Sequence, residues 1–250
     1  MELLEKEWFI QAPWGRISIL AWGDCNDPPV LVCHGENDSA ASFRPLLRLL
    51  PKNFYYIGME LPGNGKSDRF PPGQPISLLD LVFALEVVRR HFRWQRFIYM
   101  AHSIATTIGR LYNVSYPGHM TKVVELDQIT PMFGLGPENY ARCHFLSPRF
   151  TIDQRMKLMT RPPFSEPQLK AIFVNCRTPT LGVMSSNSIK RGLMDKTPYL
   201  MEEKDFDGTY RVRFVEGTHD VHVISPHLVA PYVREFLLHG LEALDLKSKL

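Results

Sequence analysis

Short apolar segments alternate with longer amphipathic ones along most of the chain, and this alternation limits the fold more than any other feature. The short segments are rich in β-branched and aromatic residues and end at turn residues, which is typical of buried strands. Apolar strands joined by helices form parallel sheets with helices on both faces, so we expect an α/β fold. The expected strands are residues 14–22, 29–33, 54–60, 97–102, 123–127, 180–184 and 210–215, and the expected helices are residues 39–50, 77–92, 104–116 and 226–241.

The alternation stops between residues 130 and 177, where proline, arginine and methionine are frequent. Helical patterns within this stretch cover residues 151–160 and 167–175. A chain of 250 residues that is 44% hydrophobic is near the upper size for one hydrophobic core. We therefore interpret residues 1–250 as a single domain, with a short cap inserted at about residues 130–177.

Charge, cysteine and histidine patterns exclude several classes of protein. The 29 basic residues are interspersed with 26 acidic ones, so nucleic-acid binding is not indicated. Met1 to Trp14 has no continuous apolar core, so we expect a soluble protein without a signal peptide or membrane span. The four cysteines are widely spaced and the histidines are dispersed, so we expect reduced thiols and neither a metal site nor a cofactor.

The strand expected at residues 97–102 runs directly into the helix expected at residues 104–116, with Ser103 at the junction. A nucleophile on such a sharp turn needs small residues two positions away on each side, because strand and helix nearly touch there. Ala101 and Ala105 meet this need, although glycine is usual at both places. The alternative is that Ser103 is a plain cap of the helix N-terminus.

His34, Gly35 and Glu36 follow an earlier strand and supply a second part of the candidate active site. Glycine permits a close approach of the backbone, so this loop can direct the backbone N–H of Glu36, together with that of Ile104, at a developing oxyanion. The alternative is a strand-ending turn in which a buried His34 bonds to backbone groups.

His219 follows the last expected strand and is the candidate general base for Ser103. His222 and His227 lie close by in sequence, and a single histidine is usually a polar surface or core residue, so these two remain alternatives. Gly217, two residues earlier, favours His219.

Taken together and in this order, the motifs resemble those of the serine hydrolase-like proteins, a branch of the α/β-hydrolase superfamily, over most of residues 14–237. The resemblance implies a mostly parallel sheet of about eight strands, a Ser-His-acid triad that acts on an ester-like carbonyl, and a cap, which is shortened here. The motifs that carry it are Pro13-Trp14-Gly15, His34-Gly35 with residues 37–43, Leu61-Pro62-Gly63-Asn64-Gly65-Lys66-Ser67, His102-Ser103 and Gly217-Thr218-His219-Asp220-Val221-His222.

The triad acid is the main departure from the family pattern. The family pattern has an acid after the strand at residues 180–184, where this sequence has only serines and Asn187. Asp127, at the end of the preceding strand, is our first candidate for the acid, and Asp195 is the second. Asn187 would hold the imidazole without stabilising its positive charge, which costs up to about 10⁴-fold in turnover. The alternative for Asp127 is a carboxylate that accepts backbone N–H bonds or pairs with Arg177.

The last three residues are Ser248, Lys249 and Leu250, the tripeptide that peroxisomal import receptors bind at a free C-terminus. We therefore predict a peroxisomal protein, otherwise a cytoplasmic one, with the import receptor as a partner. The alternative is a frayed polar tail.

The expected function is that of a serine hydrolase of the carboxylesterase or thioesterase type, which forms an acyl-enzyme on Ser103 from a small-molecule ester or acyl substrate. Hydrolysis of a carbon–carbon bond stays open. Dehalogenase and epoxide hydrolase chemistry is excluded, because those enzymes carry a carboxylate where Ser103 stands. The alternative from another class is a catalytically impaired relative that binds a small apolar ligand or a partner protein through its cap.

Overall fold

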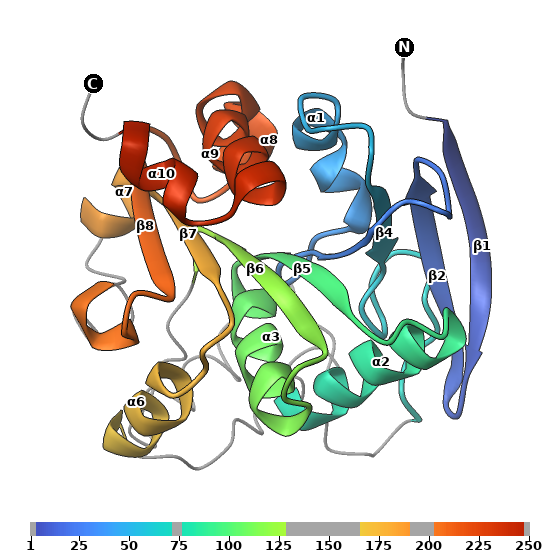
Figure 1. The fold of residues 1–250 in the computed structure, drawn as a ribbon. Helices are drawn as coiled ribbons and strands as arrows, with labels where there is room; N and C mark the ends of the chain where they lie inside the picture. Colours follow the sequence, from blue (N-terminus) through green and yellow to red (C-terminus); the bar gives the residue numbers. More distant parts are fainter. Residues whose placement is uncertain (1–3, 72–76, 129–165, 191–202, 248–250) are drawn as a thin grey trace.

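A computed structural model describes residues 4–71, 77–128, 166–190 and 203–247, and the strands in these residues form one eight-stranded sheet (Figure 1). The strand order is β1-β2-β4-β3-β5-β6-β7-β8. Every pair from β4 to β8 in this order is parallel, whereas β1 and β2 are antiparallel at one edge. The strands are β1 (Glu5–Ala12), β2 (Gly15–Trp22), β3 (Pro29–Cys33), β4 (Tyr55–Met59), β5 (Phe97–His102), β6 (Met120–Leu126), β7 (Thr180–Ser185) and β8 (Tyr210–Val215).

Helices cover both faces of the sheet (Figure 1). Helices α2, α3 and α6 lie on one face, and α1, α8 and α9 lie on the other, with α10 packed against α9. The helices are η1 (Ala40–Phe43), α1 (Arg44–Leu47), α2 (Leu78–His91), α3 (Ile104–Ser115), α6 (Glu166–Val174), α7 (Ser186–Lys190), η3 (Glu203–Phe206), α8 (Val221–Ile224), α9 (Pro226–His239) and α10 (Glu242–Lys247).

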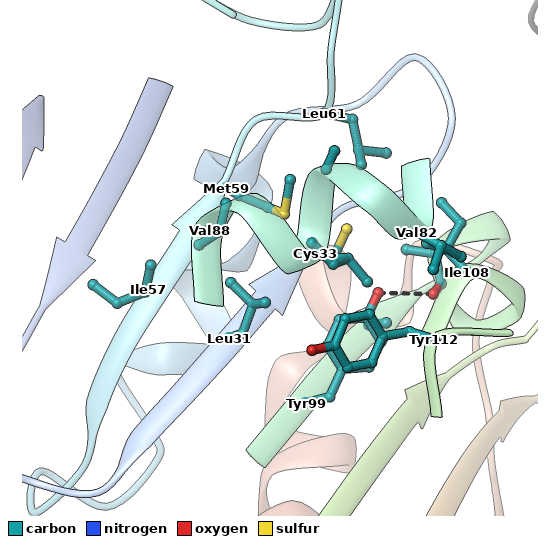
Figure 2. Packing of buried hydrophobic residues seen from close by; sticks show 14 of the residues in the cluster. Leu31, Cys33, Ile57, Met59, Leu61, Val82, Val88, Tyr99, Ile108 and Tyr112 are labelled. Atoms are coloured by element: carbon teal, nitrogen blue, oxygen red, sulfur yellow. Dashed lines mark hydrogen bonds between the residues drawn. The ribbon is translucent and has the colours of Figure 1, made fainter. Parts of the chain in front are cut away.

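The core lies on both sides of the sheet, because successive side chains of a strand point to opposite faces. In β3, Leu31 and Cys33 belong to the cluster under α2 and α3, and Val30 and Val32 belong to the cluster under α1 and α9. Figure 2 shows part of the first cluster, in which strand residues such as Leu31 pack against helix residues such as Val88. This two-sided burial explains why the central strands are apolar throughout.

The predicted fold class is confirmed: the sheet is mostly parallel, has eight strands and carries helices on both faces. The strands at residues 29–33, 97–102 and 210–215 have the predicted bounds. Helix α2 begins with a capping box, in which Ser77 accepts a hydrogen bond from the backbone N–H of Asp80 and the Asp80 carboxylate accepts one from Ser77.

The structure differs from the expected secondary structure in two places. Strand β1 was not predicted, because its side chains are mostly exposed and its charged residues hide the strand pattern. The single helix expected at residues 39–50 is instead the short η1 followed by the four-residue α1, with Pro45 in the first turn of α1. Proline lacks the N–H that a continuous helix needs at this point, so the chain makes two short helices.

The predicted cap lies largely outside the described residues, as does the helix expected at residues 151–160. The helix expected at residues 167–175 is present as α6. Across the described ranges, none of the helices is both long enough and apolar enough to cross a membrane. Cys25, Cys33 and Cys176 are free thiols, and Cys143 lies outside the described residues.

Candidate active site

Ser103 lies on the turn between β5 and α3, with a φ of 57° and a ψ of −127°. A positive φ is uncommon for a residue with a Cβ and stores strain that surrounding contacts must hold. The Ser103 N–H donates to the carbonyl of Leu126 at 3.1 Å, and the Thr106 hydroxyl donates to the carbonyl of Ser103 at 2.7 Å. Ser103 therefore stands on a strained strand-to-helix elbow, and among the described residues its side chain does not cap the helix.

The loop after β3 packs directly against this elbow. A Cβ placed on Gly35 would lie 3.1 Å from the Cβ of Ser103 and 2.9 Å from Nδ1 of His102, so only glycine fits there. Glu36 follows Gly35, and Ile104 begins α3, where the first backbone N–H groups have no acceptor within the helix. Both predicted oxyanion donors thus belong to segments that flank the serine.

The structure brings Ser103, His219 and Asp127 together in one line of hydrogen bonds. Nε2 of His219 lies 2.9 Å from the Oγ of Ser103, and Nδ1 of His219 lies 2.6 Å from Oδ2 of Asp127. The imidazole can therefore donate its Nδ1 proton to the carboxylate and accept the serine proton at Nε2. Asp127 and Ser103, at the two ends of this line, are 0% and 3% exposed, and the His219 side chain between them is 30% exposed.

Asp127 follows β6 and is held by the last residue of β7 and by helix α7. Its Oδ1 accepts the backbone N–H of Ser185 at 2.7 Å, and its Oδ2 accepts a short hydrogen bond from the hydroxyl of Ser188. The sequence also allowed Asp127 to accept backbone N–H bonds or to pair with Arg177. Asp127 does accept the backbone N–H of Ser185, but Arg177 pairs with Asp207 at 3.4 Å. The segment after Met184, which lacks the expected acid, thus supplies Ser185 and Ser188 as donors that orient Asp127.

The other candidates for acid and base lie elsewhere. Asp195 lies outside the described residues. Asn187 donates its backbone N–H to the carbonyl of Gly217 at 3.2 Å, and the His219 ring bonds to Asp127 rather than to this amide. His227 is exposed on α9, and His222 is buried beside Phe43.

Comparisons with known proteins agree with the α/β fold described above. The profile of the α/β hydrolase fold family matches residues 28–145. A human serine hydrolase-like protein is 38% identical over 130 residues, which cover 52% of this chain and 63% of that protein. Human serine hydrolase-like protein 2 is also 38% identical over 130 residues, which cover 52% of this chain and 41% of that protein. These matches make the chain similar to the serine hydrolase-like proteins of the α/β-hydrolase superfamily. It spans less than two thirds of the length of these relatives.

Solved structures share the fold of this chain at low sequence identity. A thioesterase domain from the curacin biosynthetic pathway has a TM-score of 0.71 and 14% identity, with 92% of this chain and 99% of that chain covered. A carboxylesterase from Bacillus subtilis has a TM-score of 0.74 and 15% identity, with 95% of this chain and 93% of that chain covered. A haloalkane dehalogenase variant from Bradyrhizobium elkanii has a TM-score of 0.74 and 14% identity, with 98% and 100% covered.

Glu60 lies beside both ends of the loop that carries Gly35. Oε1 of Glu60 accepts the hydroxyl of Ser39 at 2.8 Å and the backbone N–H of Ala40 at 3.2 Å, and Oε2 lies 3.3 Å from Nε2 of His34. Burial disfavours the charged carboxylate, but the contacts with His34, Ser39 and Ala40 lower the pKa of Glu60 overall.

His34 also satisfies the alternative interpretation that the sequence left open. It is fully buried, and its Nδ1 lies 2.7 Å from the carbonyl of Gly35. His34 therefore fills a strand-ending turn, and its Nε2 accepts the backbone N–H of Leu61 at 3.0 Å, next to Glu60.

Two further histidines are buried behind the triad. Nε2 of His102 lies 2.9 Å from the backbone carbonyl of His219, and the rings of His102 and His222 have centroids 4.2 Å apart. Burial, together with the nearby His219, lowers the pKa of His102 to about 4, and burial lowers the pKa of His222 well below its usual value. Both imidazoles are therefore neutral at physiological pH.

A cleft of about 600 Å³ lies at the ends of the strands opposite to the triad. Its lining includes Met120 at the start of β6 and Pro179 just before β7, whereas the triad lies where β5 and β6 end. A molecule bound in this cleft would not meet Ser103, so we do not assign it to the active site.

Sequence reasoning identified the three members of the hydrogen-bonded line but missed the residues that orient them. Ser185 and Ser188 carry no sequence signal, because their role depends on the adjacency of β6 and β7. Glu60 was not singled out as a site residue either, because its hydrogen bonds to Ser39 and Ala40 appear only in the folded chain.

Proposed function

We propose that this protein is a serine hydrolase that cleaves ester or thioester bonds through an acyl-enzyme on Ser103. The observation that carries the proposal is the continuous line of hydrogen bonds from Ser103 through His219 to Asp127. A serine hydroxyl is a weak nucleophile on its own, and an adjacent imidazole held by a buried carboxylate is the arrangement that activates it.

In the proposed acylation, Oγ of Ser103 attacks the substrate's carbonyl carbon while its proton passes to Nε2 of His219. The carbonyl electron pair moves to the oxygen, which accepts hydrogen bonds from the backbone N–H groups of Glu36 and Ile104. The intermediate then collapses and breaks the bond to the alcohol or thiol. The leaving group takes the proton from His219, and the acyl group stays on Ser103.

Deacylation repeats these steps with water as the nucleophile. His219 accepts a proton from water as the water oxygen attacks the acyl carbon, and it returns that proton to Oγ of Ser103 when the acid leaves. Asp127 stays ionised and stabilises the imidazolium that forms in each half-reaction. No step needs a metal or a cofactor.

The substrate is proposed to be a small acyl ester or acyl thioester. A thioesterase domain and a carboxylesterase are among the solved proteins that share this fold, which supports these two substrate classes. The peroxisomal targeting signal and the import receptor as a partner remain predictions, because Ser248 to Leu250 lie outside the described residues.

Hydrolysis of p-nitrophenyl esters from acetate to octanoate tests the proposal. We expect the purified protein to hydrolyse at least one member of the series, and Ser103→Ala and His219→Ala to lower kcat/KM by several orders of magnitude. The chain length that is turned over fastest would report the size of the acyl pocket. A wild-type rate equal to that of Ser103→Ala across the series, and across matched acyl thioesters, would favour the binding protein over the enzyme.

A further inference from the structure

Asp38, His102 and His222 come from three distant parts of the sequence and meet behind the triad. Each offers a ligand atom, and these three atoms lie within 4.8 Å of one another. His102 and His222 are 2% and 0% exposed, while Asp38 is half-buried. The dispersed histidines gave no sequence signal for this cluster, because only the fold brings them together.

The hydrogen bond of His102 fixes which of its ring nitrogens has a free lone pair. A carbonyl oxygen only accepts, so Nε2 of His102 carries the proton that it donates to the backbone carbonyl of His219. Nδ1 of a neutral ring must then be an acceptor. This atom is buried and has no hydrogen-bond partner among the described residues. The missing side chain at Gly35 leaves space beside it, since a Cβ there would lie 2.9 Å from Nδ1.

His222 has the same arrangement. Ser42 donates its hydroxyl proton to Oδ2 of Asp38 at 2.8 Å, so the Ser42 oxygen can only accept from Nε2 of His222, which lies 3.5 Å away. That contact leaves the lone pair on Nδ1 of His222, which is also buried and without a partner in the part of the chain that the structure describes. Each ring therefore keeps a buried lone pair without a partner among the described residues, and a buried acceptor of this kind calls for a donor or a cation beside it.

We propose that Asp38, His102 and His222 bind a divalent transition-metal ion, with Zn²⁺ as the best fit. Neutral imidazole nitrogens and a carboxylate oxygen are zinc ligands, and three protein ligands leave a fourth position for water. Metal-bound histidines almost always donate their other ring N–H to a carbonyl, a carboxylate or a water. The bond from His102 to the carbonyl of His219 already has this form.

The geometry requires a modest contraction on binding. Ligand atoms that share a tetrahedral zinc at about 2.0–2.1 Å lie about 3.3 Å apart, so the two rings must rotate toward Asp38. The half-buried Asp38 provides the route by which an ion would enter. Because His102 bonds to the backbone of His219, an ion held here would also influence the position of the base.

The test is a Zn²⁺ titration of the untagged, chelator-treated full chain, followed by calorimetry. The visible spectrum of added Co²⁺ reports nitrogen and oxygen ligation independently. Asp38→Asn keeps the size of the side chain, and His222→Phe keeps a ring against Phe43. His239→Gln, at an exposed position at the end of α9, is the matched control. Circular dichroism checks that each variant is folded, and binding is read without any catalysis.

We expect one equivalent of Zn²⁺ to bind the wild type, with affinity reduced at least about tenfold in Asp38→Asn and in His222→Phe and unchanged in His239→Gln. If His222→Phe does not fold, Asp38→Asn alone decides the matter. The absence of saturable binding would show that a water or a proton sits between the rings, and equal binding by Asp38→Asn and wild type would place the ion elsewhere. Either result overturns the proposal, whether or not the protein hydrolyses esters.

Discussion

Oδ2 of Asp127 lies 2.6 Å from Nδ1 of His219, although Asp127 follows β6 and the family pattern has an acid after β7. Because β6 and β7 are neighbours in the sheet, a carboxylate at the end of either strand can reach the same imidazole. The backbone N–H of Ser185 and the hydroxyl of Ser188 then hold this carboxylate in place. The carboxylate therefore comes from the end of β6, and the end of β7 with helix α7 supports it.

The variant Asp127→Asn tests whether this carboxylate is the triad acid. The substituted amide would keep the shape of the side chain but not the charge that stabilises the imidazolium, so we expect kcat for a p-nitrophenyl ester to fall by up to about 10⁴-fold. The variant Asp195→Asn is the matched control and should retain most of the activity. If Asp195→Asn loses the activity and Asp127→Asn retains it, Asp195 is the acid and the hydrogen bond between Asp127 and His219 is only structural.

Glu60 should act as a positioning residue for the loop after β3, which carries Gly35 and the proposed oxyanion donor Glu36. The variant Glu60→Gln loses the charge that accepts hydrogen bonds from Ser39 and Ala40 at one end of the loop, so we expect kcat to fall by up to about a hundredfold, with a smaller change in KM. Glu60→Asp keeps the charge and should recover part of the loss. Glu242→Gln, at an exposed position, controls for removal of a carboxylate, and a kcat for Glu60→Gln equal to that of this control would contradict the role.

Glu86 should govern part of the acid stability of the fold. Burial disfavours its charge, but hydrogen bonds from Arg89, Arg90 and Tyr112 lower the pKa of its carboxyl from 4.5 to about 2. The unfolded chain then binds the proton more readily, so this contribution is complete above about pH 4.5 and is lost as the pH falls toward 2.

Urea unfolding of the wild type and of Glu86→Gln at several pH values measures this effect. We expect the free energy of unfolding of the wild type to decrease more steeply between pH 4.5 and 2 than that of the variant, since glutamine does not titrate. Parallel pH curves for the two proteins would show that Glu86 is not the responsible group.

The central strands could be predicted closely because both of their faces are buried, which leaves a continuous apolar segment between turn residues. Strands β3, β5 and β8 are examples. Strand β1 could not be predicted, because most of its residues are exposed at the sheet edge and its charged side chains conceal the pattern. The helix after β3 was predicted too long because helical spacing alone does not reveal the break at Pro45.

The candidate site could be predicted only where local sequence carries the chemistry. Ser103 and His219 both follow strands, with small residues nearby, so each was identifiable without a partner. The choice between Asp127 and Asp195 requires the order of strands in the sheet. The cluster of Asp38, His102 and His222 was not visible at all, since its members are far apart in the sequence and meet only in the folded chain.

Intact-mass spectrometry after treatment with a fluorophosphonate probe tests the central claim most directly, because the probe reacts only with an activated serine. We predict one adduct per chain on the wild type, located by peptide mapping to Ser103, none on Ser103→Ala, and much slower labelling of His219→Ala and Asp127→Asn. Absence of an adduct on the folded wild type, or an adduct of equal rate on all four proteins, would contradict the account of Ser103, His219 and Asp127 as a working triad.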